Sequence, residues 1–287
     1  MSKYHTPVLL QEVIDGLQVT AGKRFIDATL GGGGHAFEIL RRGGLVLGID
    51  EDNEAIRENT QLIGPHCRIV QGNFRDIETI AKNNGFDTVD GVLFDLGVSS
   101  HQLDTRSRGF SFRFDDAPLD MRFGDSSKSN AQSSAREIVN NSSFDELFNI
   151  FATFGEEERA GIIAKKILLV RKTSPIATVG QLKVCIESAI GTGNRNSVAR
   201  IFQALRIAVN SELTALQAGL TGAMKLVRVG GRIAVISFHS LEDRIVKRFF
   251  LNKQLKVIDK KPIIPNSKEQ QQNPRSKSAK LRIAEKI

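Results

Sequence analysis

A glycine loop between two hydrophobic runs is the part of this sequence best suited to holding a ligand. Its residues are Asp27-Ala28-Thr29-Leu30-Gly31-Gly32-Gly33-Gly34-His35. Glycines let the backbone approach a ligand closely, and a helix that starts near His35 offers N–H groups at its first turn. Aspartates stand on both sides of the loop, because Asp27 precedes it and Asp50 ends the next hydrophobic run. The pattern predicts a cofactor site.

Two classes of cofactor fit this loop. The spacing Gly31-x-Gly33-x-x-Ala36, with a later acid at Asp50, satisfies the dinucleotide pattern. S-adenosylmethionine is the alternative, since its usual fingerprint is an acid, then glycines, then an acid ending the next strand. Asp27 favours this second class, because a carboxylate there would repel a pyrophosphate but attract an ammonium and a sulfonium. Asp50 suits either ligand as an acceptor for ribose hydroxyls.

The residues at the ends of the third and fourth hydrophobic runs are further candidates for contacts with cofactor or substrate. Phe74 follows the third hydrophobic run, where an adenine would lie, and it can pack on that ring or simply join the core. Asp95 and Leu96 end the fourth run, at the edge that faces the reacting group. An exocyclic nucleobase amine is a poor nucleophile because its lone pair is delocalised into the ring. The Asp95 carboxylate and the Leu96 carbonyl are suited to accept hydrogen bonds from such an amine, although Asp95 could instead cap the next segment or hold cofactor.

The elements that position these residues alternate between strands and helices. Strands are expected over 24–27, 45–50, 68–70, 91–95 and 232–238, and helices after residue 35, over 51–62 and over 198–216. Continuous apolar runs separated by helical stretches predict an α/β fold with a parallel, doubly wound, Rossmann-like sheet that is covered on both faces. Gly230-Gly231 is expected to end the helix before the last strand.

The segment 104–199 interrupts this alternation. Residues 104–130 are rich in Ser, Asp, Arg and Gly and predict an irregular loop. Three helices are expected after it, two of them starting at the capping boxes Ser143–Glu146 and Thr178–Gln181. We therefore expect an inserted all-helical domain that serves substrate recognition, within a cofactor-binding domain split into 1–103 and 200–287.

The amino-acid composition limits the class of protein and the compartment in which it is expected to work. The chain has 287 residues, 40% of them hydrophobic and 25% charged, which suits a globular protein with its own core. Cys67 and Cys185 show no metal-ligand spacing, which argues for a reducing compartment and against a disulfide or a structural metal. No apolar run approaches the length of a membrane span, so we expect a cytoplasmic protein without a membrane partner.

The net charge of +8 is concentrated at one end of the chain. Residues 260–287 hold eight Lys or Arg and two acids, for a net charge of +6. Such a basic C-terminal tail predicts a phosphate-rich partner, and a solvated, disordered terminus is the alternative.

Seven stretches in order resemble the bacterial 16S ribosomal RNA (cytosine-N4) methyltransferase family along nearly the whole chain. They are His5–Leu10, Gly33–His35, Asp95–Ser100, Arg108–Phe112, Phe202–Ile207, Ser237–Arg244 and Asn273–Arg282. The resemblance implies a class I methyltransferase fold with a helical insert. It implies methyl transfer from S-adenosylmethionine to N4 of a cytidine in the decoding region, with 16S ribosomal RNA in a small ribosomal subunit as the partner.

The resemblance also implies a set of cofactor contacts, which are Gly33, Gly34, His35, Asp50, Phe74, Asp95 and Gln102. The sequence departs from the usual pattern at Thr29, where many methyltransferases have a glycine. It departs again at Phe123, where the family often has methionine, and at 196–198, where it usually has His-Pro-Ala. The last two departures lie in or beside the insert, so they concern its contacts and not the chemistry.

RNA contacts are expected from three elements. The basic tail should contact phosphates, through Arg275, Lys277, Lys280 and Arg282. The segment that begins at Arg108 follows the Asp95 strand, and either Phe110 or Phe112 is expected to stack on a flipped cytidine while the other pins the loop. His239 and Arg244, just past the last strand, are expected to complete the rim.

Two rival functions explain less of the sequence. An NAD-dependent oxidoreductase would need a second nucleotide-binding half and a hydride-handling residue, and neither pattern is found. A non-enzymatic RNA-binding protein would leave unexplained why Asp27, Asp50 and Asp95 stand at successive strand ends. The sequence therefore favours an S-adenosylmethionine-dependent RNA methyltransferase with Asp95 as the candidate catalytic residue.

Overall fold

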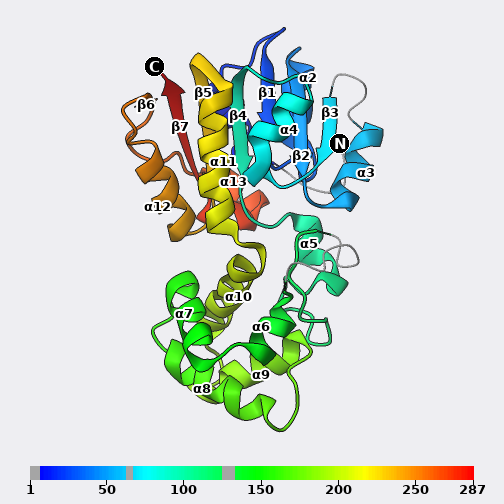
Figure 1. Cartoon of the computed structure of the whole chain (residues 1–287), viewed down its shortest axis with the longest axis vertical. Helices are drawn as coiled ribbons and strands as arrows, with labels where there is room; N and C mark the ends of the chain where they lie inside the picture. Colours follow the sequence, from blue (N-terminus) through cyan, green and yellow to red (C-terminus); the bar gives the residue numbers. More distant parts are fainter. Residues whose placement is uncertain (1–6, 63–66, 125–132) are drawn as a thin grey trace. The chain divides into compact units, whose positions relative to one another are not determined.

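A computed structural model describes residues 7–62, 67–124 and 133–287, which form two compact units (Figure 1). The first unit comprises Met1–Ser99 and Leu213–Ile287, and the second comprises Ser100–Glu212. The second unit is longer than the expected insert 104–199, because it includes helices α5 (Ser100–Asp104) and α10 (Arg195–Asn210). His5 and Thr6, which begin the first family motif, lie outside the described residues.

A seven-stranded sheet forms the centre of the first unit, in the order β3-β2-β1-β4-β5-β7-β6. The strands are β1 (Arg24–Asp27), β2 (Leu45–Asp50), β3 (Cys67–Gln71), β4 (Val89–Asp95), β5 (Val227–Ser237), β6 (Leu255–Val257) and β7 (Lys280–Lys286). Strands β1 to β5 run parallel, and β7 pairs antiparallel with both β5 and β6. The predicted doubly wound, class I methyltransferase sheet is confirmed, with an antiparallel edge that the apolar runs did not predict.

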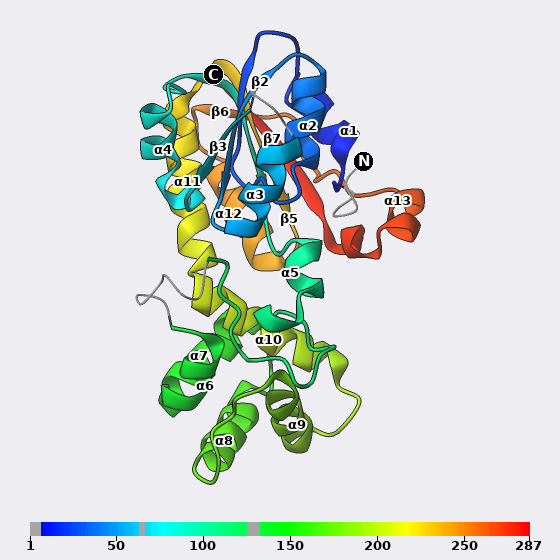
Figure 2. The same cartoon turned by 90° about the vertical axis from the view of Figure 1, so that its right-hand side faces the viewer.

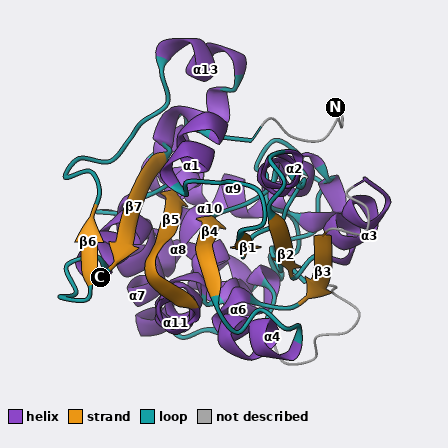
Figure 3. Ribbon diagram, turned by 90° about the horizontal axis from the view of Figure 1, so that it is seen from above, coloured by secondary structure: helices purple, strands orange, loops and turns teal. Residues whose placement is uncertain are grey.

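Helices cover both faces of this sheet, as Figure 3 shows from above. Helices α1 (Leu10–Gly16) and α2 (Gly34–Arg41) lie on one face, where Val13 and Ile39 join a buried cluster with Phe25. On the other face, α4 (Ile77–Asn83), α11 (Glu212–Leu226) and α12 (Ser240–Phe249) contribute apolar residues to a second buried cluster, which includes Phe94. Helix α3 (Asn53–Leu62) connects β2 to β3.

The helix expected over 198–216 is two helices. Helix α10 ends at Asn210, Ser211 adopts a left-handed conformation with φ 51°, and α11 follows. The Asn210 side chain accepts a hydrogen bond from the Phe123 amide at 2.9 Å and donates one to the Met121 carbonyl at 2.8 Å. These long-range bonds hold the break in place, and the apolar periodicity of the sequence continues across it.

Gly230-Gly231 lies inside β5 and not at a helix end. The strand begins at Val227, and its register against β4 is irregular between the pairs Val89–Val227 and Gly91–Arg232. Gly230 has φ 76°, and a Cβ on Gly231 would lie 2.8 Å from the Asp90 carbonyl oxygen. The two glycines therefore allow a bulge in the strand.

The basic C-terminal segment is not a tail. Residues 280–286 form β7 inside the sheet, and α13 (Ser267–Gln272) and the short helix η3 (Pro274–Ser278) precede it. Leu281 and Ile283 are buried, while Lys280 and Arg282, which alternate with them, face the other way. This period of two is a strand signal that the density of positive charge obscured.

The second unit is helical. After the short helix η2 (Arg106–Arg108) come α6 (Ala135–Asn141), α7 (Phe144–Gly155), α8 (Ala160–Arg171), α9 (Val179–Ile190) and then α10. The predicted capping boxes at Ser143 and Thr178 are confirmed, and a third one at Ser134, which was not predicted, begins α6. Across the part of the chain that the structure describes, no helix is long and apolar enough to cross a membrane.

Candidate functional site

Three acidic strand ends lie at one edge of the sheet. Asp27, Asp50 and Asp95 are the last residues of β1, β2 and β4, which are parallel neighbours. The chain passes outward from β1 to β2 and β3 and then returns to the other side of β1 to form β4. In open α/β sheets, ligands bind outside the strand ends at such a reversal of strand order. We call this edge the carboxyl edge.

The conformations of two glycines and hydrogen bonds to neighbouring residues shape the glycine loop. Gly31 has φ 50° and Gly33 has φ 72°, a region that favours glycine. The Gly31 amide donates to Asp50 Oδ2 at 2.8 Å, and its carbonyl accepts from Asn59 Nδ2 at 2.8 Å. Gly33 is the cap residue of α2, so Gly34 begins the helix at the carboxyl edge.

Asp50 holds this loop against the second strand. Its Oδ2 accepts from the Gly31 amide, and its Oδ1 accepts from the Asp52 amide at 2.8 Å. Burial raises the pKa of Asp50 to about 6, and these backbone hydrogen bonds oppose that rise. The side chain therefore shapes the loop in addition to its predicted contact with a ribose.

Asp27 is the most deeply buried of the three carboxylates, with 1% of its surface exposed. It accepts a hydrogen bond from the Thr29 amide at 3.2 Å. Burial raises the pKa of Asp27 to about 7, and the nearby charge of Asp50 adds to the rise. A buried carboxylate of this kind is stabilised in its charged form by a cation.

Asp95 combines burial with an unused acceptor. Its amide donates to the Thr29 hydroxyl at 2.6 Å, so the residue that replaces the usual glycine joins the ends of β1 and β4. Its Oδ1 is buried and accepts no hydrogen bond from the residues that the structure describes. Burial, followed by the charges of Asp27 and Glu242, holds the pKa of Asp95 well above its ordinary value. Such a perturbed, unsatisfied carboxylate is typical of a functional site.

His35 faces Asp95 from the first turn of α2. The imidazole is 5% exposed, and its Nε2 lies 3.0 Å from the Val8 carbonyl oxygen. A carbonyl only accepts, so Nε2 carries the hydrogen in this contact. The other ring nitrogen, Nδ1, lies 3.7 Å from Asp95 Oδ2.

Glu242 is a member of this acidic group that sequence reasoning missed. It is 2% exposed, and its Oε2 accepts from the Phe238 amide at 2.8 Å. Its Oε1 lies 3.1 Å from Nε2 of His239, whose Nδ1 in turn caps α12 by accepting from the Glu242 amide at 3.4 Å. The His239-x-x-Glu242 spacing after a strand is a capping-box signal that could have identified the pair.

The charge of the acidic group indicates which class of cofactor the carboxyl edge can hold. Four carboxylates, those of Asp27, Asp50, Asp95 and Glu242, are buried or largely buried at the carboxyl edge and repel one another. A pyrophosphate would increase this repulsion, whereas an ammonium and a sulfonium would relieve it. The unsatisfied Oδ1 of Asp95 marks one point where a hydrogen-bond donor is required. The residues present fit S-adenosylmethionine.

Phe74 follows β3 and begins the short helix η1 (Phe74–Asp76). Its ring is half-buried and packs edge-on against Phe94, with ring centroids 5.7 Å apart. A Cβ on Gly219 of α11 would lie 2.9 Å from the Phe74 ring. Phe74 therefore has a core role, and its predicted contact with an adenine stays a prediction.

Several further predicted contact residues, among them Gln102, Arg108 and Phe110, lie in the second unit. Gln102 is on α5. The Arg108 guanidinium donates to the carbonyls of Arg122 and Phe123, at 3.1 Å and 2.6 Å. Phe110 is buried and stacks on Phe123 with centroids 5.5 Å apart. Arg108 and Phe110 thus build the loop, which makes them poor candidates for contact with RNA.

Phe112 differs from Phe110 in its exposure. It is half-buried, and its ring meets Phe202 of α10 edge-on at 5.7 Å. Part of Phe112 therefore stays accessible, whereas Phe110 is buried.

The predicted phosphate contacts divide into two groups. Arg282 is 10% exposed and binds Asp243 through two hydrogen bonds, of 2.6 Å and 3.2 Å, while Lys280 lies 3.7 Å from the same carboxylate. These two residues hold β7 to α12, so the prediction that they bind phosphate is not supported by their geometry. Lys277 and Arg244 are exposed, and Arg275 is half-buried.

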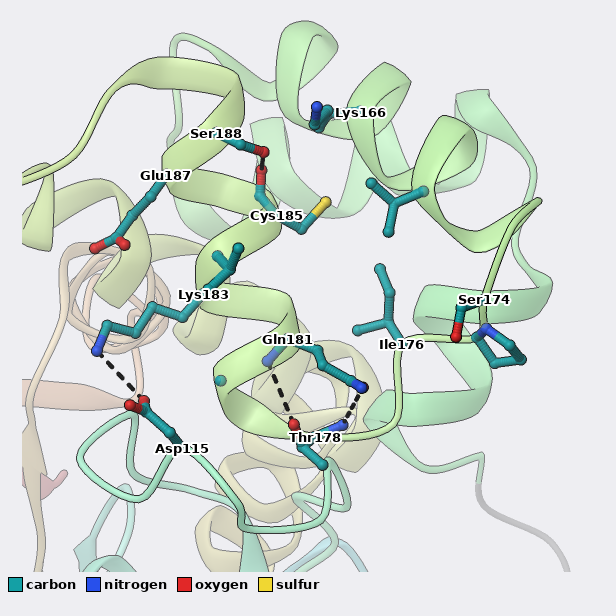
Figure 4. Close-up of a pocket in the computed structure, with 14 residues that line it drawn as sticks. Asp115, Lys166, Ser174, Ile176, Thr178, Gln181, Lys183, Cys185, Glu187 and Ser188 are labelled. Carbon is teal, nitrogen blue, oxygen red and sulfur yellow. Dashed lines mark hydrogen bonds and ion pairs between the residues drawn. The ribbon is translucent and has the colours of Figure 1, made fainter.

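A pocket of about 580 Å³ lies in the second unit, between α8, α9 and the loop that joins them (Figure 4). Charged side chains of both signs line it, and Lys183 and Asp115 pair at 3.3 Å. Burial raises the pKa of Cys185 to about 11, so the thiol in the pocket stays protonated. Nothing in this lining selects an anionic or a cationic ligand.

Comparison with known proteins places the chain among methylases. The model of the MraW methylase family matches residues 2–287. A ribosomal RNA small subunit methyltransferase H from Deinococcus deserti is 44% identical over 289 residues, which cover 100% of this chain and 94% of the relative. The protein of the same name from Deinococcus radiodurans is 45% identical, over 98% of this chain and 89% of the relative. A solved rRNA methylase from Streptococcus thermophilus gives a TM-score of 0.46 at 10% identity, over 99% of each chain.

Proposed function

This chain belongs to the MraW methylase family, and we propose that it methylates N4 of a cytidine in the decoding region of 16S ribosomal RNA. The observation that carries the proposal is the identity of 44% and 45% to two proteins named ribosomal RNA small subunit methyltransferase H, along nearly their whole length. A ribosomal RNA substrate also implies action in the cytoplasm, where ribosomes are assembled. The buried acidic group at the carboxyl edge disfavours the rival oxidoreductase, because it would repel the pyrophosphate of a dinucleotide.

S-adenosylmethionine is the cofactor, and when bound it supplies an electrophilic methyl group on a sulfonium. The residues proposed to hold it are Gly33, Gly34, His35, Asp50, Phe74, Asp95 and Gln102. Asp50 is suited to the ribose hydroxyls, because it stands at the end of β2 with its carboxylate already oriented by two backbone amides. Asp27 is suited to the positive charge, because it is buried and acidic beside the loop.

Asp95 is the proposed proton acceptor. Its Oδ1 has no partner among the described residues, so it can accept a hydrogen bond from the target amine and favour a pyramidal nitrogen. Its raised pKa makes the ionised carboxylate a stronger base than one in water. In methyl transfer to N4, the N–C bond would form as the methyl–sulfur bond breaks, with S-adenosylhomocysteine as the leaving group. The amine proton, made acidic by the new bond, would then pass to Asp95 Oδ1. The neighbouring carboxylates of Asp27 and Glu242 increase that basicity.

The second unit is the proposed RNA-recognition domain. Phe112 is our candidate for stacking on a flipped cytidine, since Phe110 is buried under Phe123. Phosphate contacts are assigned to the exposed side chains Lys277 and Arg244, and to Arg275, which shares η3 with Lys277. Lys280 and Arg282 are assigned to the fold instead.

The experiment is nucleoside analysis after reaction with a labelled methyl donor. Purified protein is incubated with naked 16S RNA and, separately, with small ribosomal subunits that lack the modification, and the RNA is digested to nucleosides. The expected product is N4-methylcytidine at one site in the decoding region, and the two arms distinguish free RNA from an assembled subunit. Label in another nucleoside, or in neither substrate, would overturn the proposal.

A further inference from the structure

The peptide group between Val8 and Leu9 makes hydrogen bonds through both its N–H and its C=O. The two partner residues lie far apart in the sequence. On one side, the Leu9 amide donates to Oε1 of Glu269, on α13, at 2.8 Å. On the other side, the Val8 carbonyl oxygen lies 3.0 Å from Nε2 of His35. Figure 2 shows α13 beside α1, close to where the described chain begins. One peptide group thus connects the C-terminal basic segment to the carboxyl edge.

The backbone at this point is not in a relaxed conformation. Leu9 has φ 53° and ψ 37°, the left-handed region, and it caps the N-terminus of α1. A non-glycine residue is strained in this region and persists there only where its surroundings impose it. The side chains of Val8 and Leu9 are buried, with 1% and 0% exposed, and Glu269 supplies the acceptor that this conformation requires.

The same segment also contacts the glycine loop directly. A Cβ added to Gly34 would lie 2.9 Å from Pro7, so the proline packs against the glycine that begins α2. Residues 7–9 therefore contact both Gly34 and His35, two predicted cofactor contacts. Any shift of this segment moves the start of α2 and its imidazole together.

The two hydrogen bonds reinforce each other because they share one conjugated amide. A carboxylate at the N–H draws electron density toward the carbonyl oxygen, which strengthens the bond that this oxygen accepts. The bond from His35 then keeps the ring hydrogen on Nε2, so Nδ1 is directed at Asp95, 3.7 Å away. The order of contacts is Glu269, the 8–9 peptide, His35 and Asp95.

We propose that Glu269 is a positioning residue, which sets the tautomer and the orientation of His35 through the Val8–Leu9 peptide. It touches neither cofactor nor substrate in this role. The inference deepens the proposed function, because the imidazole that it orients faces the proposed proton acceptor Asp95. The C-terminal basic segment, which carries Glu269, thereby takes part in building the active site.

Two variants of Glu269 separate the hydrogen bond from the charge. Glu269→Gln keeps an amide oxygen that can accept from Leu9, whereas Glu269→Ala removes the acceptor. Gln271→Ala, at an exposed position on the same helix, is the matched control. The RNA-free protein is examined by hydrogen exchange at the Leu9 amide, by 15N NMR of the His35 ring, and by calorimetry with S-adenosylhomocysteine.

In Glu269→Ala we expect hydrogen exchange at the Leu9 amide to accelerate about tenfold or more. The His35 ring nitrogens should show a mixture of tautomers, and the affinity for S-adenosylhomocysteine should fall several-fold. Glu269→Gln should keep Leu9 protection and lie close to wild type, and Gln271→Ala should match it. The proposal is overturned if Leu9 loses protection while the His35 tautomer and the affinity stay unchanged, or if Leu9 protection survives the loss of the acceptor. None of these readouts uses RNA, so failure to form N4-methylcytidine would overturn only the proposed function.

Discussion

At the scale of single residues, repulsion among the buried carboxylates at the carboxyl edge lowers the stability of the folded protein. Asp95 is surrounded by other carboxylates, and its buried Oδ1 lacks a partner among the described residues. Its raised pKa means that the folded protein binds a proton there more tightly than the unfolded chain does. This group therefore contributes most to stability below the ordinary carboxyl pKa of about 4, and the contribution is lost as the pH rises through the folded value.

Asp95→Asn should therefore stabilise the ligand-free protein at pH 8. The amide removes the repulsion from Asp27 and Glu242, and we expect a rise in Tm of about 2 °C or more, which shrinks toward pH 4. Single-turnover methylation should fall at least about tenfold, because the basic oxygen is lost. Thermal unfolding across this pH range and rapid-quench kinetics test the two effects. A variant as active as wild type, with equal cofactor binding, would show that the carboxylate has no catalytic role.

Asp50→Ala should weaken S-adenosylhomocysteine binding at least about tenfold, because each lost charge-assisted hydrogen bond costs about 1.5–3 kcal/mol. The loop also loses the acceptor that orients the Gly31 amide. Calorimetry measures the affinity, and Glu54→Ala, an exposed carboxylate on α3, is the control. Equal affinity in Asp50→Ala and wild type would refute the assignment of Asp50 to the ribose.

At the scale of elements, the sequence predicts the strands and loops that depend on neighbouring residues, and it misses features that depend on long-range contacts. Strands β1, β2 and β4 were predicted within two residues, because continuous apolar runs between helices leave little choice. The glycine loop and the acids at the strand ends followed from the same runs. The break at Ser211 could not be predicted, since it is held by bonds from Asn210 to a loop about 90 residues earlier in the chain. Glu269 was missed for the same reason, because its partner lies 260 residues away.

Strand β7 shows how one signal can mask another. The alternation of Leu281 and Ile283 with charged residues is a strand pattern, yet the charges suggested an RNA-binding tail. Partial burial opposes ionisation of Asp243, but the hydrogen bond and charge of Arg282, with Lys280 nearby, hold the pKa of that carboxyl below its ordinary value. The pair therefore stabilises the fold above a pH of about 4 and loses its effect as the pH falls.

Arg282→Ala should cost about 1.5–3 kcal/mol of unfolding free energy at pH 7, because it leaves the Asp243 carboxylate without its main partner. The deficit should shrink toward pH 3 as Asp243 becomes protonated. Lys277→Ala, at an exposed position on η3, should leave stability unchanged. Denaturant unfolding at both pH values measures the difference. Equal stability of the two variants would mean that β7 does not depend on this pair.

At the scale of the whole molecule, the positive charges of the C-terminal region fall into two groups, those exposed before β7 and those in β7 that are paired with Asp243. Residues 260–287 carry a net charge of +6, but Lys280 and Arg282 are engaged with Asp243. The exposed lysines are at 260, 261, 268 and 277, in the stretch before β7. Electrostatic attraction for RNA should therefore come from the stretch that leads into the strand, and not from the strand itself.

Replacing these four lysines with glutamine should weaken binding to all RNAs alike and reduce the slope of log K against log salt by about 0.7 for each phosphate that is no longer neutralised. Tm should change little, since the four side chains are exposed. Binding measured between low and high salt tests this, with Lys253→Gln, an exposed lysine before β6, as the control. An unchanged slope would show that RNA binds elsewhere on the protein.

The position of β7 in the sheet has a consequence for how the protein is made. Strand β7 is the last of the seven in chain order, yet it lies between β5 and β6. Among the described strands, β6 pairs with β7 alone. During translation, β5 emerges from the ribosome with one edge open, and it stays open until β7 has been synthesised. An open strand edge is prone to pair with other chains. Nascent chains of this protein should therefore depend on chaperones until β7 has been synthesised, and chains terminated before β7 should be cleared by proteases.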